Sequence, residues 1–283
     1  MKFRGSLILD IFRRIYRAIN VVLGFFNFEL LYKKNRYAED GLHSLHNHDF
    51  LEDLNFKKTI GYVSKEINNF ENKLRFRNYI AIKLAEYASH LSPNFCECGV
   101  GDGVISLSIL KYFQLKKIAI PNLWLFDTFS GIEPSIIPQQ EIKFWGISPT
   151  KKKEFYSKVY NSNVNKIKAR FLKLSKKVKI IQGFIPSTFT KKNINDIRKS
   201  GYLSFIHIDM NNSVPEVAAL KTLFPLLING GIILFDDYAY CGYNFQKQAI
   251  DVACIELGIP LPITLPTGQG LIIKSKNFSR RVF

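Results

Sequence analysis

The sequence is poor in cysteine and has no long uncharged segment. It contains four cysteines in 283 residues, and Cys96 and Cys98 lie two apart in a stretch that reads as a strand, where a disulfide between them is disfavoured. This excludes a disulfide scaffold and favours a reducing compartment. The longest uncharged run near the N-terminus, residues 18–28, is shorter than the roughly 20 residues that cross a bilayer. We therefore expect no membrane-spanning helix.

Other features that the sequence lacks exclude further classes of protein. No group of cysteines and histidines has the spacing of a zinc site, since His43, His46 and His48 lack a matching cysteine set. Asp10 interrupts the first apolar run, so a signal peptide is not expected. Hydrophobic residues make up 47% of the chain and charged residues 22%, which is enough apolar surface for a sizeable core. We expect a folded, cytoplasmic protein.

Positive charge is abundant and unevenly placed. The formal net charge is +17, and residues 150–200 hold fifteen Lys and Arg against Glu154 and Asp196, a local charge of +13. Such a segment fits a patch for an anionic partner, or simply a solvated surface in a lysine-rich chain. It lacks regularly interleaved aromatic residues and any nucleic-acid-binding signature, so we expect no nucleic acid as partner.

Residues 6–28 alternate apolar and basic side chains at helical spacing. Ile8, Ile15 and Ile19 fall on one face, and Arg13 and Arg17 on another. A helix of this kind fits an anionic membrane surface, with the protein peripheral at the inner membrane face. It fits equally well against the rest of the chain or against a second subunit of a homo-oligomer.

The pattern beyond residue 92 predicts an α/β protein. Residues 35–56 read as a polar connection, and residues 57–91 as helix in two pieces that Pro93 ends. Short apolar strands then alternate with helical stretches such as 103–113 and 216–227, which predicts a doubly wound, mostly parallel sheet. We place a boundary near residue 92, with residues 1–92 as a helical extension and 93–283 as the main domain. The predicted strands are 95–98, 123–126, 178–182, 205–209, 231–235 and 270–274.

A glycine-rich loop follows the first of these strands. Glu97, Gly99, Gly101 and Gly103 have the spacing E-x-G-x-G-x-G, and an apolar helix comes next. The glycines allow the backbone to approach a ligand closely. An acid before the first glycine suits a cationic or hydroxyl-bearing ligand better than a pyrophosphate, and S-adenosylmethionine has this character. Asp127 ends the second strand, where an acid can accept hydrogen bonds from ribose hydroxyls.

Three aspartates end two further strands. Asp209 follows strand 205–209, and Asp236 and Asp237 follow strand 231–235. The intervening helix makes these strands parallel neighbours, so the carboxylates meet and repel one another. A hard divalent cation with oxygen ligands, Mg²⁺ above all, relieves that repulsion. Alternatively, one aspartate pairs with Lys or Arg while the others face water.

These motifs together resemble the macrocin O-methyltransferase-like family. The segments that carry the resemblance are 97–100, 123–131, 183–188, 207–209 and 236–238, within about residues 75–275. It implies a Rossmann-like class I fold, S-adenosylmethionine held by the 97–103 loop and by Asp127 with Thr128 and Phe129, and a divalent metal on Asp209, Asp236 and Asp237. Relatives methylate sugar hydroxyls of natural products.

One position departs from the family. Better-known members carry a second aspartate two residues after the metal aspartate as a suggested general base, and here that position is Asn211, whose amide takes no proton at neutral pH. Asp209 itself, His207 and His48 are therefore the candidate catalytic groups, because histidine titrates near neutrality.

The resulting prediction is a metal-assisted O-methyltransferase that acts on a sugar hydroxyl. Its acceptor is expected to be a small molecule or a lipid- or nucleotide-linked sugar. The alternative that Asn211 favours is a non-catalytic cofactor-binding or scaffold protein of the same fold. A nicotinamide oxidoreductase fits poorly, since the glycine spacing is wrong and the aspartates would be unexplained.

Overall fold

The chain divides into two compact units, each described here by itself. The first comprises Met1–Ala38 and His43–His48, and the second comprises Glu39–Leu42 and Asp49–Phe283. The structure, a computed structural model, describes residues 4–26, 28, 37–44, 46–67, 74–132, 135, 137–146, 148, 150–151, 154 and 162–276.

Helix α1 (Arg4–Gly24) is the main element of the first unit. Strands β1 (Tyr37–Glu39) and β2 (Leu42–Ser44) pair as a two-stranded sheet within the segment that the sequence suggested to be an irregular connection. In the described part of the chain no helix is both long enough and apolar enough to cross a membrane.

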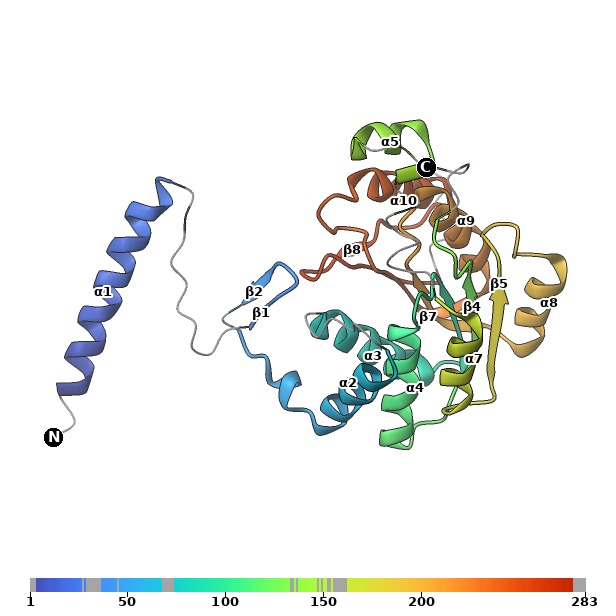
Figure 1. Ribbon diagram of the computed structural model, residues 1–283, viewed down its shortest axis with the longest axis horizontal. Coiled ribbons are helices and arrows are strands. Elements are labelled where there is room, and N and C mark those ends of the chain that lie inside the picture. Colours follow the sequence, from blue (N-terminus) through green and yellow to red (C-terminus); the bar gives the residue numbers. More distant parts are fainter. Residues whose placement is uncertain are drawn as a thin grey trace. The chain divides into compact units, whose positions relative to one another are not determined.

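A seven-stranded sheet forms the centre of the second unit (Figure 1). Its strand order is β5-β4-β3-β6-β7-β9-β8, in which β5 to β7 run parallel and β9 and β8 are antiparallel to their neighbours. This confirms the predicted doubly wound, mostly parallel sheet. The strands are β3 (Asn94–Cys98), β4 (Asn122–Asp127), β5 (Val178–Gln182), β6 (Leu203–Ile208), β7 (Leu227–Phe235), β8 (Ile263–Thr264) and β9 (Gly270–Ile273).

The strand boundaries differ from the prediction at two places that matter. β6 ends at Ile208, so Asp209 already belongs to the loop. β7 begins at Leu227, four residues before the predicted start. The helices of this unit are η1 (Asp49–Glu52), α2 (Leu54–Glu66), α3 (Arg75–Ser89), α4 (Val104–Lys116), α5 (Gln139–Trp145), α7 (Val164–Leu172), α8 (Lys191–Ser200), α9 (Ser213–Leu223), η3 (Phe224–Leu226) and α10 (Asn244–Glu256).

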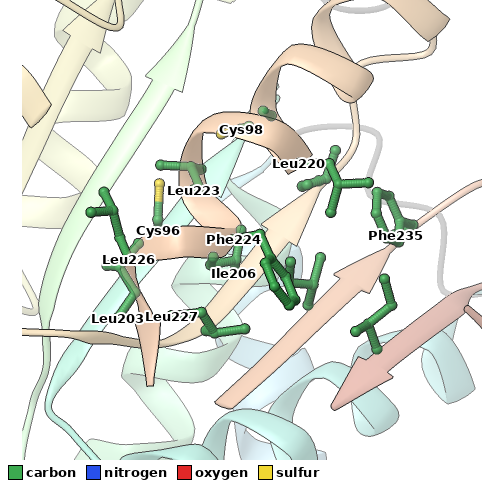
Figure 2. Packing of buried hydrophobic residues seen from close by; sticks show 14 of the residues in the cluster. Cys96, Cys98, Leu203, Ile206, Leu220, Leu223, Phe224, Leu226, Leu227 and Phe235 are labelled. Atoms are coloured by element: carbon green, nitrogen blue, oxygen red, sulfur yellow. The ribbon is translucent and has the colours of Figure 1, made fainter. Parts of the chain in front are cut away.

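One face of the sheet packs on α8, α9 and α10. Cys96 and Cys98 of β3 and Ile206 of β6 are fully buried there against Leu220 and Leu223 of α9 (Figure 2). Burial raises the pKa of the Cys98 thiol, so it behaves as an apolar side chain. Parallel strands covered on both faces are apolar almost throughout, which is why they are recognisable as short continuous runs.

Helices α2, α3 and α4 cover the opposite face. Phe95 of β3 contacts Phe113 of α4 and Phe205 of β6, with ring centroids 6.1 and 5.5 Å apart. Asp53 accepts hydrogen bonds from Asn55 N (2.8 Å) and caps α2, and the Tyr112 hydroxyl of α4 donates to it (3.2 Å). Helices α2 and α3 thus belong to the same compact unit as the sheet, and the domain boundary suggested near residue 92 stays a prediction.

The order in which successive strands are added to the sheet reverses between β3 and β6, although the strands themselves stay parallel. From β3 it proceeds to β4 and β5 on one side, and then to β6 and β7 on the other. Ligands of open α/β sheets bind at such a switch point, beyond the carboxyl ends of the strands. The two loops at this point are in contact, since Asp209 N donates to Cys98 O at 2.8 Å.

Gly99 is the residue that lets these two loops meet. Its φ is +85°, and a Cβ built on it would lie 1.7 Å from the carbonyl oxygen of Asp209. We predict that Gly99→Ala lowers the free energy of unfolding by more than about 2 kcal/mol, because both the backbone conformation and the contact are lost. Gly61→Ala is the matched control. Gly61 lies exposed inside α2 with nothing within 4 Å of such a Cβ, so that change should stabilise by about 0.5–1 kcal/mol. Urea unfolding of both variants measures the difference, and equal losses would contradict the assignment.

Candidate active site

The glycine loop between β3 and α4 is held by the carboxylate of Asp127. Asp127 Oδ2 accepts from Val100 N (2.5 Å) and Gly101 N (2.8 Å), and Oδ1 accepts from Phe129 N (2.5 Å). Gly101 and Gly103 both have positive φ, at 52° and 89°. Asp127 thus fixes the loop that the sequence assigned to the cofactor, and its predicted contact with ribose must share these oxygens.

The two residues after Asp127 form a tight turn. Thr128 Oγ1 donates to Gly131 O (2.7 Å) and accepts from Ser130 N (3.2 Å). Phe129 is buried and has a φ of 55°. Both residues shape the turn beside the loop, and their predicted contact with the cofactor stays a prediction.

Glu97 lies inside the molecule rather than at its surface. It is 3% exposed, its Oε1 lies 2.9 Å from His207 Nδ1, and its Oε2 accepts a hydrogen bond from Ser106 of α4. Glu97 and His207 are register partners on β3 and β6, which explains their pairing. Both oxygens of Glu97 are therefore used within the protein, and its predicted contact with the cofactor stays a prediction.

His207 joins Glu97 to the strand-end aspartates. Its Nε2 lies 3.6 Å from Asp236 Oδ1. Burial alone would lower the pKa of His207, but the carboxylates of Asp236 and Glu97 outweigh burial and raise this pKa to about 10. The two carboxylates therefore favour the protonated imidazole, and the predicted role of His207 as a general base stays a prediction.

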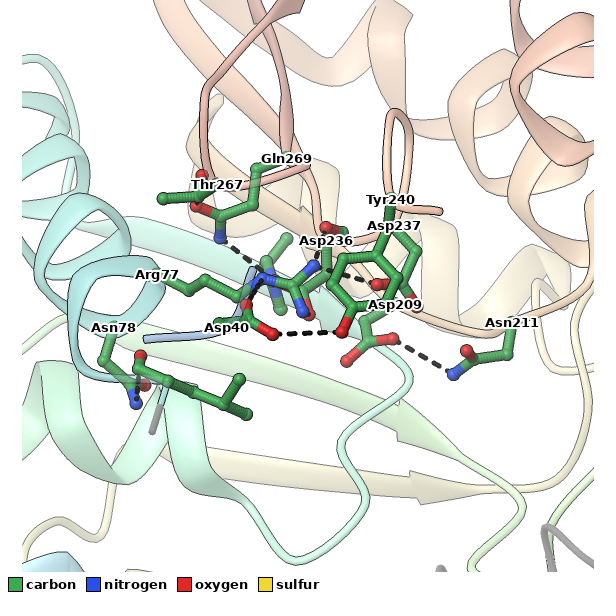
Figure 3. A network of polar contacts seen from close by, with 12 residues as sticks. Asp40, Arg77, Asn78, Asp209, Asn211, Asp236, Asp237, Tyr240, Thr267 and Gln269 are labelled. Carbon is green, nitrogen blue, oxygen red and sulfur yellow. Dashed lines mark hydrogen bonds and ion pairs between the residues drawn. The ribbon is translucent and has the colours of Figure 1, made fainter. Parts of the chain in front are cut away.

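The three aspartates predicted to meet do lie at one edge of the sheet, and Arg77 of α3 lies among them (Figure 3). Asp236 N donates to Ile208 O at 2.9 Å, which joins the end of β7 to the end of β6. Arg77 Nη2 donates to Asp237 Oδ1 (2.8 Å) and to the carbonyl oxygen of Asp236, and Nη1 lies 3.4 Å from Asp236 Oδ2.

Residues from two distant loops complete this cluster. Arg77 Nε lies 3.7 Å from Asp40 Oδ2, and the guanidinium carbon lies 4.9 Å from the centroid of the Tyr240 ring. The Tyr240 hydroxyl donates to Asp40 Oδ1 (3.0 Å). Gln269 Nε2 donates to Asp236 Oδ1 (3.0 Å), so each member is held by more than one neighbour.

The guanidinium decides how the aspartates ionise. Burial would raise the pKa of Asp236, but Arg77 and His207 hold this pKa well below its usual range. Burial and the charge of Asp236 raise the pKa of Asp237 to about 6 against the opposing effect of Arg77. Burial and the charges of Asp236 and Asp237 raise the pKa of Asp209 well above its usual value. Acids outnumber cations here, and Asp209 is the one that Arg77 compensates least.

Asp209 lies closest to the glycine loop. Its backbone bonds to Cys98, and its carboxylate accepts a hydrogen bond from Asn211 Nδ2 (3.3 Å). Among the described residues no ion pair joins Asp209 to Arg77. In the described structure Asp209 is therefore the strand-end acid whose carboxylate forms no ion pair with the guanidinium.

The cluster does not fit the predicted divalent metal in its present arrangement. Carboxylate oxygens are suitable donors for Mg²⁺. However, the oxygens of Asp236 and Asp237 that would hold it contact Arg77, and within the described ranges no three His, Cys, Asp or Glu side chains are grouped to hold a metal ion. The alternative that the sequence left open, pairing with an arginine, describes these contacts.

One candidate, His48, belongs to the first unit and its predicted catalytic role stays a prediction, whereas the site contains several residues that the sequence missed. His48 Nδ1 lies 3.1 Å from His46 O. Arg77, Asp40 and Tyr240 were not predicted, because they reach the site from a helix and two loops without a motif. Arg77 lies within the stretch 57–91 that was predicted to be helical, and nothing in the sequence marked it as a site residue.

Comparison with known proteins identifies relatives of this chain. A family model described as Macrocin-O-methyltransferase (TylF) matches residues 74–254, which is more than half of the chain. The solved structure of the O-methyltransferase NovP has a TM-score of 0.56 at 16% identity, and the match covers 71% of this chain and 80% of that one. CalS11, a calicheamicin methyltransferase, has a TM-score of 0.53 at 14% identity, with 81% and 93% covered. At such identities the likeness concerns the fold. No curated protein sequence matches the chain.

The charge of His207 leads to a pH-dependent stability. Its pKa is raised from about 6.5 in the unfolded chain to about 10 in the folded one. Its stabilising contribution is therefore complete below pH 6.5 and is lost as the pH rises towards 10. We predict that the difference in free energy of unfolding between the wild type and His207→Gln shrinks over this range by up to about 1.4 kcal/mol per pH unit. Denaturant unfolding with chelator present measures it, and a constant difference would contradict the raised pKa of His207.

Proposed function

Because the chain belongs to the macrocin-O-methyltransferase family, we propose that it methylates a hydroxyl of a sugar in a bacterial glycan or natural product. As a member of this family, it is an O-methyltransferase that uses S-adenosylmethionine. The observation that supports the proposal most directly is the contact between the glycine loop and the Asp209 loop at the switch point of the sheet.

The arrangement suits a direct transfer between two bound molecules. In this proposal the 99–103 loop, fixed by Asp127, holds the cofactor, and Asp209 faces the acceptor hydroxyl. When bound, S-adenosylmethionine would supply an electrophilic methyl group for the acceptor hydroxyl. The hydroxyl proton passes to the Asp209 carboxylate. Holding the two reactants in line supplies much of the rate, and a positioned base adds about 10²–10⁴-fold.

The basic segment supports an anionic acceptor, such as a nucleotide- or lipid-linked sugar. Arg170 Nη1 lies 3.2 Å from the carbonyl oxygen of Asp102 in the glycine loop, and Ser162 Oγ donates to Asp102 Oδ1 (2.8 Å). Ser162, just before α7 (Val164–Leu172), and Arg170, in its last turn, thus border the cofactor loop. Lys166 and Lys168 on α7 add positive charge near this border.

We predict that Asp209→Asn lowers methyl transfer by at least about 100-fold, because the amide cannot take the proton. Affinity for S-adenosylhomocysteine should change less than about threefold, since the glycine loop is intact. Transfer is measured with radiolabelled S-adenosylmethionine against a panel of nucleotide-linked and free sugars, and affinity by calorimetry. Full transfer by the variant would refute the role of Asp209. Cofactor binding by the wild type without transfer to any hydroxyl acceptor would favour the non-catalytic alternative.

We also propose that α1 places the enzyme at an anionic membrane surface on the cytoplasmic side. Phe12 (65%) and Ile15 (50%) of α1 and Phe25 (83%), just after it, are exposed although they are apolar, and Arg14 and Arg17 of α1 are exposed as well. An interfacial helix combines these features, since its apolar face enters the headgroup region while arginines attract anionic lipid.

We predict that the full-length protein binds vesicles that contain an anionic lipid and leaves neutral vesicles unbound. Reversing two charges in Arg14→Glu/Arg17→Glu should lower binding more than about tenfold, because each arginine contributes about 1 kcal/mol near such a surface. Lys191→Glu/Lys192→Glu on α8 is the charge-matched control. Cosedimentation measures binding. Equal loss of binding in the control variant would contradict the membrane assignment. An oligomer in solution that buries α1 and forms equally well in the Arg14→Glu/Arg17→Glu variant would also contradict it.

A further inference from the structure

Arg77 occupies the position between acids where a cation is needed. Its side chain is 8% exposed, and its three nitrogens face three different aspartates. Nε faces Asp40, Nη1 faces Asp236, and Nη2 faces Asp237 together with the backbone carbonyl of Asp236. A guanidinium has five donors in a fixed plane, so one side chain can satisfy several carboxylates that converge from different loops.

The guanidinium and a divalent ion would compete for the same oxygens. Arg77 contacts Asp237 Oδ1 and Asp236 Oδ2, which are one carboxylate oxygen from each of the two aspartates that follow β7. Two cations at one site repel each other, and a carboxylate oxygen already paired with arginine must give up that pair before it binds a metal.

Arg77 is held too firmly to leave easily. The ring of Tyr240 stacks on its guanidinium, and the hydroxyl of the same tyrosine holds Asp40, the acid that faces Nε. Its charge is secured as well, because Asp236 and Asp237 raise the pKa of Arg77 against the effect of burial. Desolvated contacts of this kind strengthen one another.

The neutral amide of Asn211 agrees with this arrangement. A carboxylate at this position would add another negative charge beside Asp209, whereas the amide donates a hydrogen bond to it. The site therefore contains one built-in cation and, at residue 211, an amide in place of a further negative charge.

We propose that Arg77 takes the place of a divalent cation in this site, so that it orders the strand-end aspartates and methyl transfer proceeds without added metal. Arg77 is a positioning residue, since it acts through Asp236 and Asp237. The statement about transfer rests on the proposed function, whereas the statement about metal binding does not.

The test measures metal binding directly, with Mn²⁺ alone as the probe. Electron paramagnetic resonance of free Mn²⁺ reports binding to the full-length protein without cofactor or acceptor. We expect weak or undetectable binding by the wild type and at least a tenfold gain in affinity for Arg77→Met, which frees the carboxylates and keeps the apolar stem. Adding Asp237→Asn to that variant should remove the gain.

Two further variants keep the result interpretable. Arg75→Met removes an arginine two residues away on α3 that pairs with Glu39, so it should show no gain. Arg77→Lys keeps a cation in place and should also bind little Mn²⁺, even if Arg77→Met proves too unstable to study. Tight Mn²⁺ binding by the wild type that Asp237→Asn abolishes would overturn the proposal, as would an equal gain in Arg75→Met.

Transfer in the presence of chelator supplies the second measurement. With an acceptor in hand, wild-type activity should survive exhaustive chelation within about twofold. Loss of activity that Mg²⁺ restores would overturn the proposal. If no acceptor is methylated at all, the proposed function fails, and the Mn²⁺ measurements still decide the role of Arg77.

Discussion

The contact on which the carboxyl edge of the sheet depends is that between the Arg77 guanidinium and the aspartates after β7. Asp236 and Asp237 lie side by side in sequence, and Asp209 joins them because β6 and β7 are neighbours. Their repulsion in a partly buried site would cost several kcal/mol without a counter-charge. One arginine from α3 supplies this charge, and in doing so it ties a helix outside the sheet to the strand ends. Removing the Arg77 side chain would leave these buried aspartates without a counter-charge. The contacts that hold Arg77 in place therefore also stabilise the aspartates.

The central sheet was predictable because a strand that is buried on both faces has a short, nearly continuous run of apolar residues. β3, β4 and β6 are short, largely buried runs, and each was placed within a residue or two. The short strands were not predictable. β8 has two residues, and β1 and β2 have three each, so their sequences show no period. Tertiary pairing rather than propensity decides such strands.

The site was predictable to the extent that strand ends define it. Asp127 and Asp209 were found because an acid after a buried strand must lie at the carboxyl edge of a parallel sheet. Arg77 and Asp40 were not found, since a helix and a hairpin bring them in from sequence positions far from any motif. The same limit affected Glu97. Its position in the motif was evident, but its pairing with His207 depends on the register of β3 against β6.

These particulars change what the glycine motif means in this chain. Asp127 and Glu97 both use their carboxylates in contacts within the protein. Asp127 accepts hydrogen bonds from the loop backbone, and Glu97 pairs with His207. Fixing the loop and the aspartates beforehand costs stability, because buried charges must be desolvated and paired. Because the loop and the aspartates are already ordered, binding of the cofactor and the acceptor loses little free energy to ordering the protein. More of the binding free energy is then available to align the two reactants. A site ordered by its own arginine also keeps this alignment whatever the concentration of divalent ions around it.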